Sequence, residues 1–382
     1  MTQRFKAAYA AGFVAFAVTA ILSHFHPTPY NNFVLLAQAL LHGHAWIDWP
    51  GAYIDALHYG ANRYYVIEAP LPALLLVPFV AIFGTQTNQT VLGVVLAGVA
   101  VGAAWELGER FGLRRSANAW ICAFLLAGTD LLWCAMLGDV WFVAHVCVVC
   151  FTMLALVELA GQRRGWLVAL FAACAFESRF SMIAVLPVYL YLLITPAPSR
   201  KRVTSFVAVL IGVGMLWALY NLARWGTWID VGYTTWYHQD QVGMPTGSPF
   251  RLSYFPYQLG SFFVQMPTKL PTFPWLRPEF SGVALTWTSP AIVLAFLARA
   301  PVRWVIALWI AALLAAIPNF LYYVNGFAQF GMRHALDFEP FLVALMMLAV
   351  RQHFPRWGYL LIAYSIAVGL WGCWYWLTFV RT

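Results

Sequence analysis

Residues 23–84 read SHFHPTPYNNFVLLAQALLHGHAWIDWPGAYIDALHYGANRYYVIEAPLPALLLVPFVAIFG, and their placement decides how the rest of the chain is interpreted. This stretch separates the first strongly apolar segment from the next long one. In a chain with only 9% charged residues it holds three acids, Asp48, Asp55 and Glu68. Because ionisable side chains are costly in hydrocarbon, we expect this stretch to lie outside the membrane and to carry chemistry.

The first part of the stretch predicts a short amphipathic helix. Thr28 is a suitable N-cap and Pro29 suits the first helical position. Gly43 suits the left-handed conformation with which helices commonly end. The apolar side chains fall on one stripe, opposite the polar ones, and they are Phe33, Leu36, Ala37, Leu40 and Leu41. We expect the helix to lie on the membrane surface. The alternative is a loop helix packed on a protein core.

The composition indicates an all-α polytopic membrane protein. The chain is 62% hydrophobic and 17% aromatic, whereas soluble domains carry about 25% charge. About eleven segments are candidate spans, several of them shorter than the roughly 20 residues of a perpendicular helix. They are Ala7–Ser23, Thr90–Leu107, Ala117–Leu137, Trp141–Ala160, Trp166–Ala175, Met182–Ile194, Val203–Ala223, Val283–Leu297, Trp304–Tyr323, Phe338–Val350 and Tyr359–Val380.

The basic residues predict the orientation, provided that Leu71–Phe83 does not cross the membrane. Short cytoplasmic loops collect Lys and Arg. If Leu71–Phe83 is a half-buried or surface helix after the breaks at Pro70 and Pro72, the short inner loops hold most of the basic residues. These are Arg4, Lys6, Arg110, Arg114, Arg115, Arg163, Arg164, Arg200, Lys201, Arg202, Arg299, Arg303, Arg351 and Arg356. The N-terminus is then cytoplasmic and the C-terminus periplasmic or extracellular.

This orientation gives one transmembrane domain over residues 1–382 with two large outer segments. The first outer loop, 24–89, contains juxtamembrane helices. The second, 224–282, is rich in Tyr, Trp, Pro and Gly, which favours ordered loops and interfacial helices at the headgroup level.

Several other classes of protein have no support in the sequence. The net charge of +8 is explained by membrane orientation, so we predict no nucleic-acid partner. All six cysteines lie inside apolar runs and are interpreted as small buried hydrophobes. Gly-rich nucleotide loops, HExxH and GxSxG are all missing from the sequence, and the one CxxC spacing, Cys147 to Cys150, lies inside an apolar run. We predict no cofactor, and the sequence leaves a divalent metal open.

Ionisable residues beside the spans are the next candidates for function. Asp139 and His145 flank the start of one span, and for His145 an interhelical hydrogen bond is the favoured interpretation. Glu177 and Arg179 lie in FESRF between two short apolar runs, where the alternative to a functional role is a structural ion pair between them. Near the C-terminus, Arg333 and His334 precede a span that has Asp337 and Glu339 at its head.

The order of these features resembles the GT-C superfamily of polytopic glycosyltransferases. Residues 29–48, PYNNFVLLAQALLHGHAWID, and 63–84 look like the first outer loop of the protein mannosyltransferase and aminoarabinose transferase families. RHALDFEPFLVAL, which begins at Arg333, looks like their Arg-x-x-x-x-x-x-Pro segment before a late span. The resemblance implies a bacterial inner-membrane enzyme that takes a hexose or pentose from a polyprenyl-phosphate carrier.

The implied reaction inverts the sugar during transfer to a lipid or glycan acceptor at the outer face. A carboxylate would act as general base, while cationic side chains offset the charge on the leaving phosphate. We expect the donor phosphate to be bound from among Arg333, His334, Arg179, Arg63 and Lys269. Substrate contacts are expected from Glu68, Tyr64, Asp139 and Asn31.

The identity of the base does not transfer from these families. They carry an acid at the start of the first outer helix, where this chain has Asn31 and Asn32, and a Lys where it has Glu68. The base must therefore be Asp55 or Asp48. We rank Asp55 first, because we expect partial burial to raise its pKa toward the working range of a base, whereas Asp48 suits a turn.

A lipid-linked sugar flippase or transporter without chemistry is the competing class. Such proteins show ionisable residues near the midplane, often in two related halves. Only Glu177 and Arg179 fit that description, and the sequence shows no second copy of the pattern.

Overall fold

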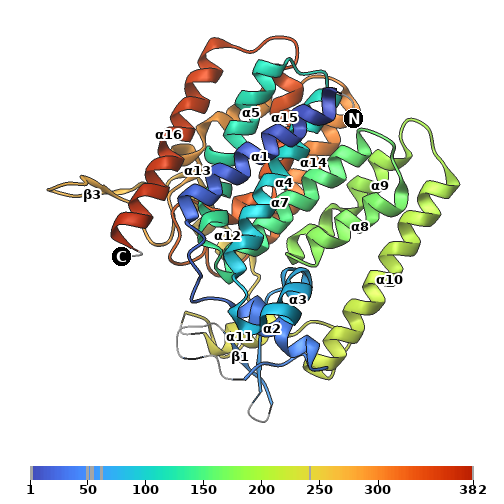
Figure 1. Ribbon diagram of the computed structural model, residues 1–382, viewed down its shortest axis with the longest axis vertical. Helices are drawn as coiled ribbons and strands as arrows, with labels where there is room; N and C mark the ends of the chain where they lie inside the picture. Colours follow the sequence, from blue (N-terminus) through green and yellow to red (C-terminus); the bar gives the residue numbers. More distant parts are fainter. Residues whose placement is uncertain (1–2, 49–50, 52–55, 61–62, 241, 381–382) are drawn as a thin grey trace.

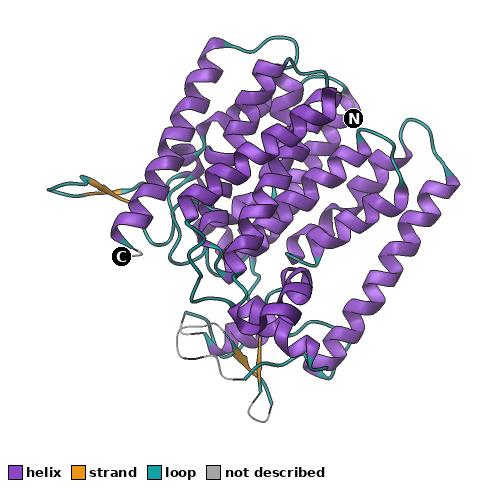
Figure 2. Cartoon of the chain, viewed as in Figure 1, coloured by secondary structure: helices purple, strands orange, loops and turns teal. Residues whose placement is uncertain are grey.

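The computed structural model describes residues 3–48, 51, 56–60, 63–240 and 242–380, and most of these residues are helical (Figure 2). The α-helices are α1 (Gln3–Ser23), α2 (Asn32–Leu41), α3 (Leu71–Phe83), α4 (Gln89–Arg110), α5 (Arg115–Ala127), α6 (Leu131–Leu137), α7 (Val140–Leu159), α8 (Gly165–Phe176), α9 (Leu186–Ile194), α10 (Arg200–Trp225), α11 (Gly232–Gln239), α12 (Phe255–Phe263), α13 (Leu285–Thr288), α14 (Val302–Phe320), α15 (Glu339–Val350) and α16 (Arg356–Phe379).

Short 3-10 helices and two small hairpins complete the described elements. The 3-10 helices are η1 (Gly84–Gln86), η2 (Phe180–Val185), η3 (Leu252–Tyr254), η4 (Pro290–Leu297) and η5 (Arg333–Asp337). Strands β1 (Leu57–His58) and β2 (Tyr64–Tyr65) pair antiparallel, as do β3 (Thr268–Lys269) and β4 (Leu276–Arg277).

Within the described chain, six helices are long and apolar enough to cross a membrane. They are α1, α4, α7, α10, α14 and α16. A seventh span is possible if α5 and α6, which meet at an angle of 49°, cross as one bent unit. These helices confirm the all-α polytopic class. The count of eleven spans stays a prediction, because the remaining candidates are short apolar helices.

The core of the bundle is built around α4 and α7, and the glycines of α4 let neighbouring helices approach closely. A Cβ added to Gly98 in α4 would lie 2.9 Å from the carbonyl oxygen of Gly12 in α1. Small residues at such crossings allow the backbone contacts that pack helices inside a membrane. The six cysteines are all free thiols, five of them buried, as the apolar sequence around them predicts.

Helices α2, α3 and α11 and strand β1, which come from the two segments predicted to be outer, lie together at one end of the bundle (Figure 1). The start of α1 and the end of α16 lie at opposite ends of the bundle (Figure 1). Helix α10 stands at the side, in contact with α8 (Figure 1).

The start of α2 differs from the predicted one. The helix begins at Asn32 rather than Pro29, and Asn31 occupies the cap position without a side-chain cap bond. Thr28 is not the cap, because its hydroxyl donates to the Asp139 carboxylate instead. Gly43 has φ +80°, the left-handed conformation predicted for it. The buried side of α2, including Phe33, packs against α3 and the protein core, which favours the alternative of a core-packed helix.

Helix α3 has the features of a helix that does not span. Its 13 residues extend about 20 Å at 1.5 Å per residue, short of the roughly 30 Å of a hydrocarbon core. Pro72 lies in its first turn and Pro78 interrupts its interior. The backbone N–H of Leu71 donates to the Glu177 carbonyl at 2.9 Å, which ties α3 to the end of α8.

The last turn of α10 is joined to the chain before α3 by a buried arginine. Arg224 donates to the Asp230 carboxylate at 2.6 Å and to the Val66 carbonyl oxygen at 3.3 Å. Its guanidinium carbon lies 4.2 Å from the centre of the Tyr220 ring. This contact fixes the chain just before Glu68.

Candidate active-site cavity

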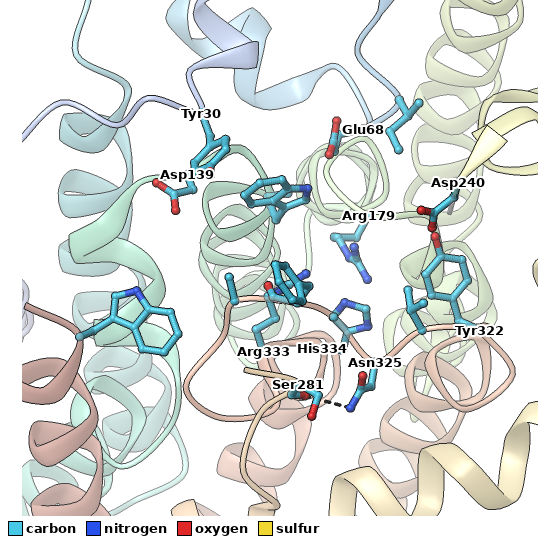
Figure 3. Close-up of a pocket in the computed structure, with 18 of the residues that line it drawn as sticks. Tyr30, Glu68, Asp139, Arg179, Asp240, Ser281, Tyr322, Asn325, Arg333 and His334 are labelled. Carbon is cyan, nitrogen blue, oxygen red and sulfur yellow. Dashed lines mark hydrogen bonds between the residues drawn. The ribbon is translucent and has the colours of Figure 1, made fainter. Parts of the chain in front are cut away.

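A cavity of about 1250 Å³ lies between the bundle and the chain segments around α2, α3 and α11. Its walls come from the α1–α2 connection, the chain before α3, the start of α7, the α8–η2 turn, α11, the α14–η5 loop and the end of α16 (Figure 3). Segments distant in sequence therefore meet around one space, which is large enough for a sugar with part of a lipid carrier.

One side of the cavity, which we call the basic wall, consists of Arg179, Arg333 and His334 (Figure 3). Arg179 follows the end of α8 and is held by Asp337, whose side chain is fully buried. Both Nε and Nη2 of Arg179 lie 3.4 Å from Asp337 Oδ2. The guanidinium is thus fixed at the cavity surface by a carboxylate behind it.

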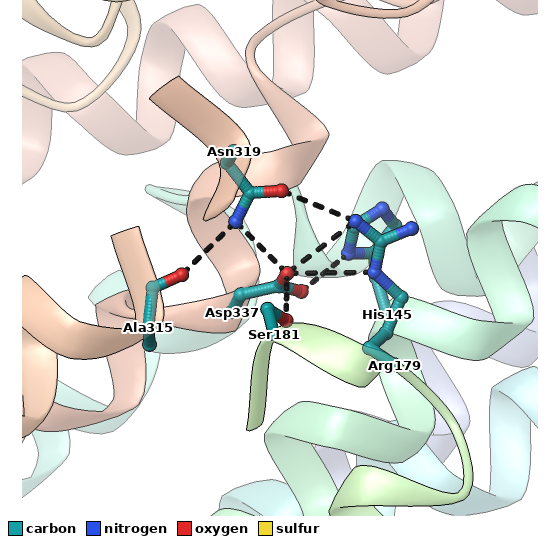
Figure 4. A network of polar contacts seen from close by, with 6 residues as sticks. All are labelled: His145, Arg179, Ser181, Ala315, Asn319 and Asp337. Carbon is teal, nitrogen blue, oxygen red and sulfur yellow. Dashed lines mark hydrogen bonds and ion pairs between the residues drawn. The ribbon is translucent and has the colours of Figure 1, made fainter. Parts of the chain in front are cut away.

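Asp337 is the centre of a network of polar contacts (Figure 4). Its Oδ2 accepts from the Ser181 hydroxyl at 2.6 Å and from the Asn319 amide at 3.0 Å, and its Oδ1 lies 2.9 Å from His145 Nδ1. Burial alone would raise the pKa of Asp337, but the charges of Arg179 and His145 and these hydrogen bonds hold it well below its usual range. The carboxylate is therefore ionised and compensates Arg179.

Arg333 and His334 belong to the same 3-10 turn, η5, that carries Asp337. Arg333 Nη1 donates to the Gln329 side chain at 2.8 Å and to the Phe327 carbonyl at 3.2 Å. His334 is buried, and its Nδ1 has no hydrogen-bond partner among the described residues. Burial and the neighbouring guanidiniums of Arg179 and Arg333 lower the pKa of His334 well below its usual value. We infer that His334 is neutral and offers a hydrogen bond rather than a charge.

Among the described residues, three carboxylates also line the cavity, Glu68, Asp139 and Asp240. Asp139 immediately precedes α7 and accepts a hydrogen bond from the Thr28 hydroxyl. Glu68 and Asp139 are both buried, each with 6% of its surface exposed. The cavity thus combines basic groups with potential proton acceptors.

Asp240 belongs to a side of the cavity that we call the loop wall, made by Glu68, Asp240, Tyr322 and Tyr323. The Tyr323 hydroxyl donates to the Asp240 carboxylate. Burial and this carboxylate both raise the pKa of Tyr323, so the phenol keeps its proton. Behind them the hydroxyls of Tyr237 and Tyr254 lie 3.0 Å apart. The Tyr323–Asp240 contact links the segment after α11 to the segment after α14, two of the three segments that form this wall.

The structure brings together five of the residues selected from the sequence. Arg179, Arg333, His334, Glu68 and Asp139 line the same cavity. His145 makes the interhelical contact predicted for it, with Asp337. Among the described residues no ion pair joins Glu177 to Arg179, so the local ion pair considered for FESRF is wrong: Arg179 pairs with Asp337, 158 positions along the chain.

Other residues selected from the sequence lie elsewhere. The Arg63 guanidinium carbon stacks 5.3 Å from the centre of the Trp46 ring, and Lys269 is exposed on strand β3. Tyr64 pairs with His58 between β1 and β2. Asn31 precedes α2. None of these four is among the described residues that line the cavity.

The structure describes only one of the two residues proposed as the base. Asp48 is exposed, and it is not among the described residues of the cavity walls. Asp55 lies outside the described residues. Both assignments stay predictions.

Sequence reasoning missed Asp240, Tyr322, Tyr323 and Asn325. Asp240 is the single acid in the aromatic and polar run WYHQDQ, and an isolated acid of this kind could have been selected as a candidate site residue. Tyr322, Tyr323 and Asn325 come from YYVNGF, which precedes the Arg333 segment. In the described chain, no three His, Cys, Asp or Glu side chains gather as metal ligands.

Comparison with known proteins supports the fold. The sequence matches no protein-family profile and no curated protein significantly. The structure is similar to a crystal structure of ArnT from Cupriavidus metallidurans bound to undecaprenyl phosphate, with a TM-score of 0.54 and 17% sequence identity. The similarity covers 94% of this chain and 62% of that one, so this chain spans less than two thirds of the ArnT length. The chain has the GT-C type of fold.

Proposed function

We propose that this protein is a glycosyltransferase that moves a hexose or pentose from a polyprenyl-phosphate carrier to a lipid or glycan acceptor. The basic wall is the observation that carries the proposal, because it presents Arg179, Arg333 and His334 to a single cavity. The GT-C fold, shared with a protein that binds undecaprenyl phosphate, supports the same class of substrate.

In this proposal, Arg179 and Arg333 bind the donor phosphate, while neutral His334 contributes one hydrogen bond. Guanidinium groups suit phosphate because their donors match its oxygens in pairs. Asp337 fixes Arg179 before substrate arrives, so little reorganisation is needed when charge develops on the leaving phosphate.

The proposed chemical step is a direct displacement at the anomeric carbon. The acceptor oxygen forms a bond to that carbon as the bond to the phosphate oxygen breaks, which inverts the configuration. The acceptor hydroxyl gives its proton to a carboxylate, and polyprenyl phosphate leaves. Asp55 remains our proposed base, with Asp48 as the second candidate, and the cavity acids Glu68, Asp139 and Asp240 are the alternatives to test beside them.

We place the reaction at the outer face of the bacterial inner membrane. The prediction rests on the distribution of Lys and Arg, with Arg110, Arg163 and Lys201 facing the cytoplasm and the cavity facing outward. Labelling of a single cysteine at position 115 by an impermeant reagent added from outside would overturn this orientation.

The activity is tested directly with purified protein and radiolabelled polyprenyl-phosphate sugars, scored for transfer to lipid or glycan acceptors. Transfer that requires the protein is the expected result. Donor that crosses a reconstituted bilayer without being consumed would instead identify a flippase.

The phosphate site is tested by donor binding to Arg333→Ala and Arg333→Lys. Losing charge-assisted hydrogen bonds worth about 1.5–3 kcal/mol should weaken binding roughly 10- to 100-fold in the alanine variant. Lysine should rescue only part of the loss, because the planar fork is missing. Arg63→Ala is the matched control, since Arg63 lies outside the cavity walls described above. Equal donor affinity in wild type and both Arg333 variants would remove Arg333 from the site.

A further inference from the structure

A small hairpin projects from the bundle beside the end of α16 (Figure 1). Its strands β3 and β4 pair Thr268 with Arg277 and Lys269 with Leu276. The hairpin reads TKLPTFPWLR over residues 268–277 and contains no acid. Two paired residues on each side give it little backbone bonding of its own, so its side chains decide what it contacts.

Those side chains combine exposed aromatic rings with exposed cations. Phe273 is 59% exposed and Trp275 is 62% exposed, although both are large rings that ordinarily seek burial. Lys269 and Arg277 are exposed on the two strands. Aromatic rings and basic groups in one short segment are typical of the boundary between membrane and water.

The contacts of the hairpin place it at such a boundary. The Phe273 ring centre lies 5.9 Å from that of Trp374 and 6.4 Å from that of Phe379, in the last turns of α16. Because α16 is long and apolar enough to cross the membrane, its end marks one membrane surface. Trp376 and Leu377, in the same turns, line the cavity. The hairpin therefore lies near the level at which the cavity meets the lipid.

We propose that hairpin 268–277 is a docking surface for anionic phospholipids in the leaflet from which the cavity is reached. Phe273 and Trp275 insert at the headgroup level, and Lys269 and Arg277 bind lipid phosphates. Juxtamembrane cations attract an anionic surface by about 1 kcal/mol each, and the hairpin has no acid to oppose this attraction. The proposal does not depend on the transferase activity.

A protein strand is a poorer occupant of this surface. Pro271 and Pro274 remove backbone donors that an added strand would need. Strands of two residues also offer too short an edge for strand addition.

Docking at the hairpin has a structural consequence for the cavity. The chain leaving β4 reaches Phe280, whose ring lies 6.1 Å from that of Trp376 and 6.2 Å from that of Phe327. Both of these partners line the cavity. Lipid bound to the hairpin therefore holds one edge of the cavity mouth.

Depth measurements on the full chain in nanodiscs test the proposal. Spin labels are attached through Phe273→Cys and Trp275→Cys, with Thr246→Cys in an exposed outer loop as the matched control, in a background without native cysteines. In nanodiscs containing phosphatidylglycerol, oxygen should relax the labels at 273 and 275 more strongly than a water-soluble nickel chelate does. The ratio of the two effects should be higher at 273 and 275 than at 246. Equal relaxation at 275 and 246 would overturn the docking.

A second measurement keeps the native cysteines. Quenching of tryptophan fluorescence by brominated phospholipid is compared between wild type and Trp275→Phe, and the difference should show Trp275 in contact with lipid. Binding of phosphatidylglycerol to this surface should fall about 30-fold in the Lys269→Ala/Arg277→Ala variant, because two attractions are lost. Equal binding of phosphatidylglycerol and phosphatidylcholine by wild type would overturn the anionic preference.

Discussion

The basic wall and the loop wall of the cavity are held in different ways. Arg179 on the basic wall is fixed by a fully buried carboxylate that also contacts His145, Ser181 and Asn319. Asp240 on the loop wall is held by a tyrosine hydroxyl between two loops. The difference indicates that the group proposed to bind phosphate is preorganised, whereas the wall facing it can adapt to an acceptor.

The largest expected effect comes from removing the charge behind the basic wall. Asp337→Asn leaves Arg179, which is partly exposed at the cavity surface, without its compensating carboxylate, and the upper bound on this loss is about 3–5 kcal/mol, the cost of breaking a fully buried pair. Thermal unfolding in detergent should show this loss, together with loss of donor binding. Asp240→Asn is the matched control and should cost less than about 1 kcal/mol. Equal stability of the two variants would show that the two walls do not differ.

The second prediction asks whether the base lies in the outer loop or at the cavity walls. Asp55→Asn should lower turnover by roughly 10²-fold or more while donor binding and thermal stability stay near wild type. Single-turnover assays should be run on Asp48→Asn, Glu68→Gln, Asp139→Asn and Asp240→Asn in parallel. Should Asp55→Asn keep substantial turnover while one of these variants abolishes it, that residue is the base.

A smaller effect is expected from Tyr323→Phe on the loop wall. The change removes the hydroxyl that donates to Asp240 and leaves the ring in place. Because one hydrogen bond contributes about 0.5–1.5 kcal/mol, we expect acceptor KM to rise by up to roughly tenfold. Donor affinity, measured separately, should not change. A change confined to donor affinity would place Asp240 on the phosphate side.

The smallest effect concerns pH. The pKa of His334 is lowered by burial and by Arg179 and Arg333, so the ring binds a proton only well below its ordinary pKa of about 6.5. The ratio of donor affinities of wild type and His334→Gln should therefore be constant between about pH 8 and pH 6. A cationic His334 would instead tighten binding as pH falls through about 6.5. Equilibrium binding across this range separates the two cases.

The sequence predicted the parts of this molecule that depend on local composition. Apolar segments located the helices, and Pro70 and Pro72 indicated why α3 should not span. Arg179 and Arg333 were selected because a charged side chain beside an apolar run costs free energy and therefore usually has a functional role.

The sequence did not predict which residues of distant segments contact one another. Arg179 was considered with Glu177, two residues away, yet its partner is Asp337. The three cavity acids come from three separate segments, and only the fold shows that Asp240 faces the same space as Glu68. The concentration of acids in the first outer segment directed attention to Asp48, which is exposed.

The contact between Arg224 and Val66 makes the shape of the cavity depend on the thickness of the bilayer. Helix α10 has 26 residues, and its apolar stretch from Val203 to Ala223 spans about 32 Å at 1.5 Å per residue, close to the roughly 30 Å of hydrocarbon. Acyl chains of another length would no longer match this stretch, and a mismatch is relieved by a change of helix tilt. Because the last turn of α10 holds the backbone two residues before Glu68, tilting the helix moves the loop wall relative to the basic wall. Longer or shorter acyl chains should therefore open or narrow the cavity without any ligand.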